Sequence, residues 1–274
     1  MNDIAPQTII RSGSASNGYW LDIWRHRELL LFLAWRDILV RYKQTVIGIT
    51  WVVIRPVLTM LILTVVFGRV AGLPSGDAPY ALLVFTGLLP WYFFSNALSE
   101  CSNSLVANSH LLSKVYFPRL IVPSSTILVS AVDFIVSIAV LIILMLWYQI
   151  APTTKLLAIP LLGIMVGLLS LGIGLLFSSL SVRYRDFRHL VPFMLQLGVY
   201  ASPVGYSTSV ISEKWAYIYY LNPIAGIIDG VRWAIIGTTP SLYGISISII
   251  FIISMMTIGI IYFRSEEARF ADDI

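Results

Sequence analysis

Three ionisable side chains interrupt stretches of the sequence that are otherwise apolar. Arg55 stands directly before Pro56 inside one apolar stretch, Glu100 closes the next, and Asp133 lies within the third. A charge in the hydrocarbon of a membrane costs about 3 kcal/mol or more, so such residues are retained for a reason. Two roles fit equally well: Arg55 pairs with Glu100 or Asp133 and orders a helix bundle, or the three residues line a path for a polar substrate.

Signatures of other chemistry are absent from the sequence. It contains no GxxxxGK[ST] phosphate-binding loop, no HExxH or CxxC metal motif and no GxSxG nucleophile motif. His26, His110 and His189 lack the spacing of metal ligands, and the single cysteine, Cys101, excludes an intramolecular disulfide. The sequence therefore predicts no catalytic residues, no metal and no cofactor in this chain.

Aromatic side chains are a second unusual feature, with 8 Trp and 14 Tyr in 274 residues. Most Trp and Tyr of membrane proteins form belts at the two interfaces. Sugars, however, have apolar C–H faces that stack on aromatic rings, and a pore lined with such rings would offer a glycan many weak contacts. The residues predicted to line such a channel are Trp51, Trp91, Tyr200 and Tyr206.

Composition indicates the elements that carry these residues. The chain is 58% hydrophobic and 12% charged, whereas soluble domains carry about 25% charged residues. Six stretches approach the ~20 apolar residues that cross a membrane as a helix. They are Val46–Phe67, Tyr80–Ser99, Ile121–Trp147, Leu156–Leu180, the short Leu190–Tyr206, which contains Pro192 and Pro203, and Leu242–Phe263. The predicted fold is an all-α membrane protein with six transmembrane helices.

The remaining segments complete the predicted domain organisation. Residues 1–18 are polar and predict a flexible tail, and residues 19–45 predict a cytoplasmic helix in the membrane interface, with a Trp-rich face beside a basic one. Residues 46–263 form the six-span domain, and residues 264–274 a charged cytoplasmic tail.

The stretch Trp215–Gly237 is ambiguous, because it is apolar but contains Asn222-Pro223, Asp229 and Arg232. As a full span it would place the termini on opposite sides of the membrane. As two short re-entrant helices it leaves six spans, and irregular backbone at membrane depth is tolerated where protein or a cavity surrounds it. We favour the re-entrant arrangement.

Basic residues orient the six spans, because cytoplasmic loops are enriched in Lys and Arg. Thirteen of the 18 basic residues fall on the side of both termini. They are Arg11, Arg25, Arg27, Arg36, Arg41, Lys43, Lys114, Arg119, Arg183, Arg185, Arg188, Arg264 and Arg269. Both termini are therefore predicted to be cytoplasmic, in a multi-pass membrane protein.

Four segments, in the same order, resemble the branch of the ABC-2 export permeases that exports polysaccharides. The segment Arg36–Leu58 (RDILVRYKQTVIGITWVVIRPVL) is similar to the family's entry into its first span. Asn108–Pro123 and Ser181–Gln196 resemble its two cytoplasmic loops, and Tyr219–Gly237 resembles its Asn-Pro segment before the last span. Arg55 departs from the resemblance, since the family carries apolar or polar residues there.

The resemblance implies a homodimer with a pore between the subunits, driven by two copies of a cytoplasmic ATPase that bind the ATP and Mg. It implies that ATPase coupling involves Leu111, Lys114, Phe117 and Arg119. It places Arg183, Arg185 and Arg188 where a lipid pyrophosphate enters. It assigns an external gate to Tyr219, Asn222, Pro223, Asp229 and Arg232.

The function that the resemblance implies is export of an undecaprenyl-pyrophosphate-linked polysaccharide, an O-antigen, across the inner membrane. Export of capsule or teichoic acid is a close alternative, and no nucleic-acid partner is expected. A membrane-embedded glycosyltransferase or acyltransferase is a more distant alternative. Such an enzyme would need clustered acidic or histidine bases, for which Asp229 alone is a weak candidate.

Overall fold

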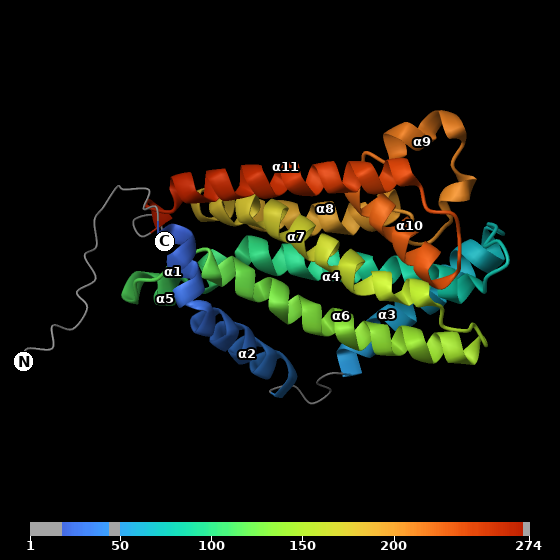
Figure 1. Cartoon of the computed structure of the whole chain (residues 1–274), viewed down its shortest axis with the longest axis horizontal. Coiled ribbons are helices and arrows are strands. Elements are labelled where there is room, and N and C mark those ends of the chain that lie inside the picture. Colours follow the sequence, from blue (N-terminus) through green and yellow to red (C-terminus); the bar gives the residue numbers. More distant parts are fainter. Residues whose placement is uncertain (1–17, 44–49, 271–274) are drawn as a thin grey trace, which may run out of the picture.

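The computed structural model describes residues 18–43 and 50–270 as a bundle of helices (Figure 1). The first half of the chain forms α1 (Tyr19–Arg25), α2 (Arg27–Lys43), α3 (Thr50–Leu63), the π-helix η1 (Thr64–Val70), α4 (Tyr80–Ala107), α5 (Ser109–Lys114) and α6 (Ile121–Trp147). The second half forms η2 (Thr154–Leu157), α7 (Ala158–Arg183), α8 (Phe187–Ala201), η3 (Thr208–Val210), α9 (Glu213–Tyr219), α10 (Pro223–Ile235) and α11 (Leu242–Glu266). Residues 1–17 of the predicted tail, 44–45 of the interface helix, 46–49 of the first span and 271–274 of the C-terminal tail lie outside the described residues.

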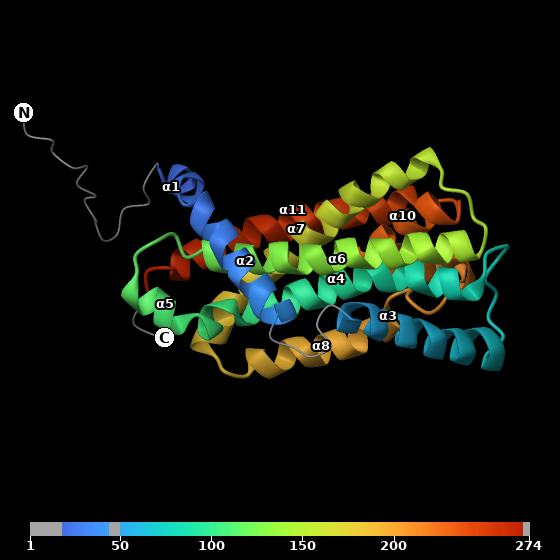
Figure 2. The same ribbon diagram turned by 90° about the horizontal axis from the view of Figure 1, so that it is seen from below.

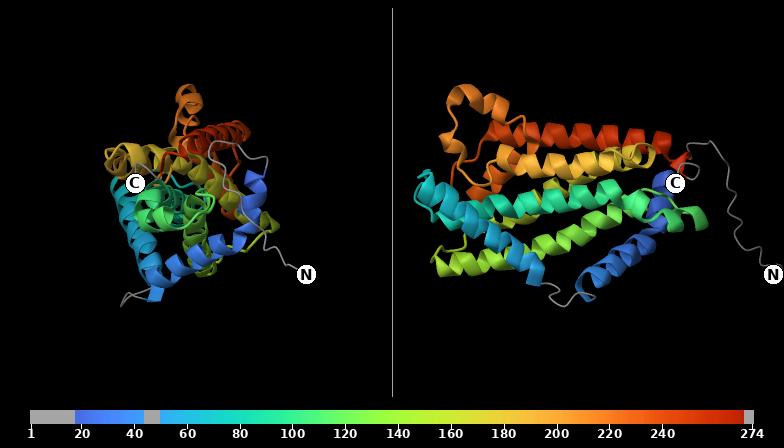
Figure 3. Two further views of the ribbon diagram at one scale, coloured as in Figure 1. Left: turned by 90° about the vertical axis from the view of Figure 1, so that its left-hand side faces the viewer. Right: turned by 180° about the vertical axis from the view of Figure 1, so that it is seen from behind.

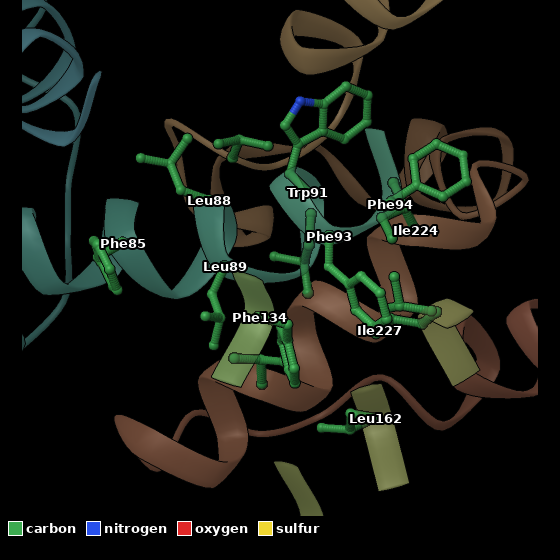
Figure 4. Close-up of a cluster of buried hydrophobic side chains, with 14 of the residues drawn as sticks. Phe85, Leu88, Leu89, Trp91, Phe93, Phe94, Phe134, Leu162, Ile224 and Ile227 are labelled. Atoms are coloured by element: carbon green, nitrogen blue, oxygen red, sulfur yellow. The ribbon is translucent and has the colours of Figure 1, made fainter. Parts of the chain in front are cut away.

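Helix α4 is the centre of the bundle. It packs against α3, α6, α7, α8 and α10, and most of its side chains are buried. A cluster of buried apolar side chains surrounds it, with Phe93 stacked on Phe134 of α6 at a ring distance of 5.0 Å (Figure 4). Because the first half of α4 is apolar on every face, it is stable only inside a larger assembly of helices.

Glycines allow α7 and α11 to approach one another closely. A Cβ atom at Gly259 would lie 2.3 Å from the carbonyl oxygen of Gly172, and one at Gly172 would lie 2.7 Å from the backbone nitrogen of Met256. Small residues at such contacts are typical of membrane helices, which associate by close packing of backbones.

Five helical segments within the described ranges are long and apolar enough to cross a membrane. They are Thr50–Val70, Tyr80–Ala107, Ile121–Trp147, Thr154–Arg183 and Leu242–Glu266. They correspond to five of the six predicted spans, although the second continues to Ala107, well beyond Ser99, and the last ends at Glu266, three residues after Phe263. The first ends in a π-helical segment that the sequence pattern did not predict.

The predicted fifth span, Leu190–Tyr206, is only partly helical. Helix α8 begins at Phe187 and ends at Ala201, and its 15 residues extend about 22 Å at 1.5 Å per residue, less than the ~30 Å of a hydrocarbon core. The stretch Trp215–Gly237 is no single span either, because α9 and α10 are separate helices of 7 and 13 residues. Asn222 divides them by capping α10, where its side chain accepts a hydrogen bond from the amide of Ile224.

The predicted interface helix consists of two helices, divided at His26. Helix α2 packs on α6 and lies obliquely to the bundle (Figure 2). Trp20 and Trp24 of α1 and Trp35 of α2 are exposed. Helix α1 meets the C-terminal end of α11, where the Tyr19 hydroxyl donates to Oε1 of Glu267 at 3.2 Å. Both ends of the described chain therefore lie at one end of the bundle.

Substitution of Gly259 tests the close contact of α7 with α11. Gly259→Leu places side-chain atoms against the Gly172 backbone, and overpacking of this kind costs about 3 kcal/mol. We expect less monodisperse protein after heating in detergent, measured by size-exclusion chromatography. Thr257→Leu, on the exposed face of the same helix, is the control; equal losses from both variants would contradict this packing.

Candidate functional site

A cluster of charges joins α2, α4 and α6. Arg41, in the last turn of α2, pairs through Nη1 with Oδ2 of Asp133 at 2.6 Å and through Nη2 with the carboxylate of Glu100. The Tyr42 hydroxyl donates to the other carboxylate oxygen of Asp133. Burial disfavours the charged guanidinium, but the two carboxylates outweigh that effect and raise the pKa of Arg41. Burial and the Asp133 hydrogen bond raise the pKa of Tyr42.

The predicted pairing of Arg55 with Glu100 or Asp133 is wrong, because Arg41 binds both carboxylates. Arg41 was assigned to the cytoplasmic side from sequence, since it lies before the first apolar stretch. The packing of α2 along α6 brings its guanidinium between the two membrane helices, a tertiary contact without a local signal.

A cavity of about 420 Å³ adjoins this cluster. Its lining includes Trp51 and Arg55 of α3, Tyr92 and Asn96 of α4, and Ser137 of α6, together with the cluster itself. The Tyr92 hydroxyl lies 2.7 Å from Oγ1 of Thr59, which links α3 to α4 beside the cavity. The cavity therefore combines aromatic rings with charged and amide side chains.

The four aromatic residues predicted to line a channel lie in different environments. Trp51 on α3 is 55% exposed and Tyr200 on α8 is 67% exposed, while Tyr206 is half-buried after α8. Helices α3 and α8 both pack on α4 and lie on the same side of the bundle (Figures 2 and 3). Trp91 instead is 5% exposed in the core, against Gly198 and Phe94 (Figure 4), so in this structure it is a packing residue.

Two of the predicted coupling residues lie on the short helix α5, and the other two lie in the loop that follows it. Lys114, at the end of α5, is exposed and Leu111 is half-buried. Phe117 is buried, and the amide of Arg119 donates to Oε1 of Glu267 at 2.9 Å, while its guanidinium donates to the Glu267 carbonyl. Arg119 therefore fixes this loop to the C-terminal segment, a contact that its position in the sequence does not reveal.

The predicted pyrophosphate residues Arg183, Arg185 and Arg188 are all exposed near the turn between α7 and α8. Arg188 also lines a second polar cavity of about 620 Å³, between α2, α4 and α8. Arg36 of α2, which the sequence reasoning missed as a site residue, lines this cavity and donates to Oδ1 of Asn108 at 3.0 Å.

Arg232, a predicted gate residue, is among the most buried side chains, at 2% exposure. Its guanidinium donates to the carbonyl of Pro203, lies 3.4 Å from the carbonyl oxygen of Val204, and pairs with Asp229 at 3.9 Å. Asp229 also accepts from the Tyr220 hydroxyl at 2.7 Å. Asp229 is therefore bound to both Tyr220 and Arg232.

Other side chains bind the same non-helical segment. The Tyr80 hydroxyl donates to the carbonyl of Gly205 at 2.7 Å, and Nδ2 of Asn222 donates to Oγ of Ser202 at 2.9 Å. Pro223 begins α10 directly after this contact. The segment that follows α8 is therefore held by side chains from α4, α10 and the Asn222 cap.

A row of aromatic rings covers the same end of the bundle. Ring centroids lie 6.5 Å apart for Phe67 and Tyr206, 6.4 Å for Tyr206 and Tyr219, and 6.0 Å for Tyr219 and Tyr220. The Tyr219 hydroxyl donates to that of Tyr206 at 3.2 Å.

Among the described side chains, no group of three or more His, Cys, Asp or Glu could hold a metal ion.

Comparison with known proteins gives one family match and several relatives. The family described as ABC-2 type transporter matches residues 28–236. The chain is similar to the O-antigen export system permease protein RfbA of Klebsiella pneumoniae, with 28% identity over 246 residues that cover 89% of this chain and 94% of the relative. RfbA of Myxococcus xanthus is 27% identical over 77% of this chain and 81% of its own length. The polysialic acid transport protein KpsM of Escherichia coli is 26% identical over 86% of this chain and 92% of its own length.

Removal of Arg41 should destabilise the protein. Arg41→Met leaves the Glu100 and Asp133 carboxylates without this cation, at a cost of up to about 3 kcal/mol, reduced because the Glu100 side chain is 36% exposed. We expect a lower melting temperature in detergent, and recovery of most of the loss in the triple variant Arg41→Met/Glu100→Gln/Asp133→Asn.

The control for this experiment is Arg25→Met, because Arg25 pairs with Asp22 while its own side chain is 66% exposed. A surface pair contributes only about 0–1 kcal/mol. A triple variant as unstable as Arg41→Met would show that packing, and not charge, explains the loss.

Proposed function

Since the chain belongs to the ABC-2 type transporter family, we propose that it is the permease subunit of an exporter that moves a lipid-linked polysaccharide across the inner membrane. The observation that carries this proposal is the similarity to O-antigen export permeases along 89% of the chain. The exposed aromatic rings of α3 and α8 support it, because sugar faces stack on such rings. The proposed substrate is an undecaprenyl-pyrophosphate-linked O-antigen.

Capsular polysaccharide is the second candidate substrate. The similarity to a polysialic acid transport protein extends over 86% of the chain, and nothing in the aromatic surface distinguishes one glycan backbone from another. The two candidates share one mechanism, in which a long polymer slides past weak and replaceable ring contacts.

The energy for export is proposed to come from a separate ATPase, because the sequence contains no phosphate-binding loop. Two copies of this subunit would bind ATP and Mg and would act on a homodimer of the chain. The exposed end of α5 around Lys114 is the proposed docking element. Phe117 and Arg119 would transmit its movement to the bundle, since Arg119 is bound to the segment that follows α11.

The proposed topology has both termini in the cytoplasm and α9 outside. Between the end of α7 and α9 the chain passes along the whole bundle (Figure 1). Helix α8 and the residues after it would therefore make the sixth crossing. The side-chain hydrogen bonds to residues 202–205 meet the requirement that backbone groups at membrane depth be satisfied within the protein. Helices α9 and α10, with Tyr219, Asn222, Pro223, Asp229 and Arg232, would form the external gate.

Co-purification of the ATPase tests the proposal. The tagged wild-type chain should retain a P-loop ATPase from its native membranes, and Lys114→Glu should reduce the retained amount about tenfold, equivalent to ~1.4 kcal/mol, because a docking charge is reversed. Lys214→Glu, at an exposed lysine within α9, is the control. If no ATPase is retained by the wild type, the subunit assignment is wrong; equal loss in both variants would refute the docking site.

Truncation of the exposed aromatic residues tests the glycan path. Trp51→Ala and Tyr200→Ala should lower surface polysaccharide several-fold while the amount of membrane-inserted protein stays near wild type, since neither ring is buried. Trp91→Ala is the contrasting variant, because loss of a buried Trp costs about 3–5 kcal/mol and should reduce the amount of folded protein. Unchanged export from both exposed-site variants would remove these rings from the path.

A further inference from the structure

Arg55 is an exposed cation within helix α3. It lies five residues after Thr50, about 7.5 Å along the helix axis at 1.5 Å per residue. Its guanidinium makes no ion pair or hydrogen bond with the side chains described by the structure, although it lines the 420 Å³ cavity. Arginine has five N–H donors, and at membrane depth they need acceptors.

The carboxylates and the Tyr92 hydroxyl that line the same cavity as Arg55 already bind other side chains. Glu100 and Asp133 line the same cavity, but both carboxylates are bound by Arg41, and Asp133 also accepts from Tyr42. The Tyr92 hydroxyl is engaged with Thr59. Among the described residues, the cavity therefore presents the Arg55 guanidinium without a partner, while Arg41 binds both carboxylates.

Two further side chains complete the lining beside Arg55. Asn96 of α4 is half-buried and lines the cavity without a hydrogen bond to any described residue. Trp51 lies one helical turn before Arg55, so both project from the same face of α3. A guanidinium binds phosphate or carboxylate oxygens in pairs, an amide binds hydroxyls, and an indole ring can cover a sugar face.

We propose that Arg55, with Asn96 and Trp51, forms a site for an anionic group of the transported molecule, next to a sugar ring. The proposal rests on the function proposed above and names the part of the substrate that this site recognises. The anionic group is either the diphosphate that joins the carrier lipid to the first sugar or a carboxylate of an acidic sugar. Both present paired oxygens to the guanidinium.

Binding measurements on the full-length chain in phosphatidylcholine nanodiscs separate these sources. Farnesyl diphosphate is the probe for a lipid diphosphate, a glucuronate-containing oligosaccharide is the probe for a carboxylate, and farnesol is the uncharged reference. Arg55→Gln should weaken binding of an anionic probe about tenfold, while Arg55→Lys should retain part of it, because lysine keeps the charge but not the paired donors. Arg69→Gln, an exposed arginine at the other end of the same span, is the control.

Loss confined to farnesyl diphosphate identifies the carrier, loss confined to the oligosaccharide identifies an acidic glycan, and loss of both supports a general anion site. Binding by Arg55→Gln equal to wild type, equal loss in Arg69→Gln, or no binding by wild type overturns the proposal and leaves Arg55 as a charge that reaches the membrane surface. Surface polysaccharide in a strain lacking the native permease distinguishes failure of this site from failure of the proposed function. If wild type restores it, the proposed function stands whatever the binding result, and if wild type does not, the function itself fails.

Discussion

Hydrogen bonds from the Arg232 guanidinium to main-chain carbonyls replace the helical bonds that are lost where α8 ends at Ala201. An unpaired carbonyl in an apolar interior costs several kcal/mol, so this irregular segment requires donors from elsewhere in the fold. Arg232 supplies them to Pro203 and Val204, and Tyr80 supplies one to Gly205. Gly87 leaves room for the segment, since a Cβ there would lie 2.8 Å from the Val204 carbonyl oxygen. Helix α10, which packs against α4, α7 and α11, delivers this guanidinium.

Arg41 also joins separate elements of the bundle, through its ion pairs with α4 and α6. Arg41 and Arg232 each lie in the last turn of a helix, where a cation also interacts favourably with the helix dipole. Arg41 binds Glu100 of α4 and Asp133 of α6. Arg232 binds the carbonyl of Leu83 in α4 and that of Pro203 after α8. Helix α4 is thereby bound by Arg232 near its start and by Arg41 about two turns before its end, with apolar packing between them.

Sequence reasoning predicted the elements better than the contacts between them. Hydropathy located five long helices, and Asn222-Pro223 correctly marked the division between α9 and α10. It could not predict that α8 stops at Ala201, because an apolar composition continues past the break. Nor could it identify Arg41 as the partner of Glu100 and Asp133, since 59 and 92 residues separate it from them. The sequence gives no sign that Trp91 and Tyr200 lie in different environments. Only the fold shows that the Trp91 ring is buried and the Tyr200 ring is exposed.

The arrangement separates a rigid core from a surface suited to a sliding substrate. Helices α4, α6, α7, α10 and α11 share most of the buried contacts, whereas α3 and α8 each rest mainly on α4 and leave one face uncovered. Elements with fewer buried contacts open at lower free energy than the core, so α3 and α8 can shift without unpacking the centre. Trp51, Arg55 and Tyr200 all lie on these two helices. In the proposed exporter, rings and a cation on a surface that can shift would bind a passing polymer by several weak contacts and hold it tightly at none.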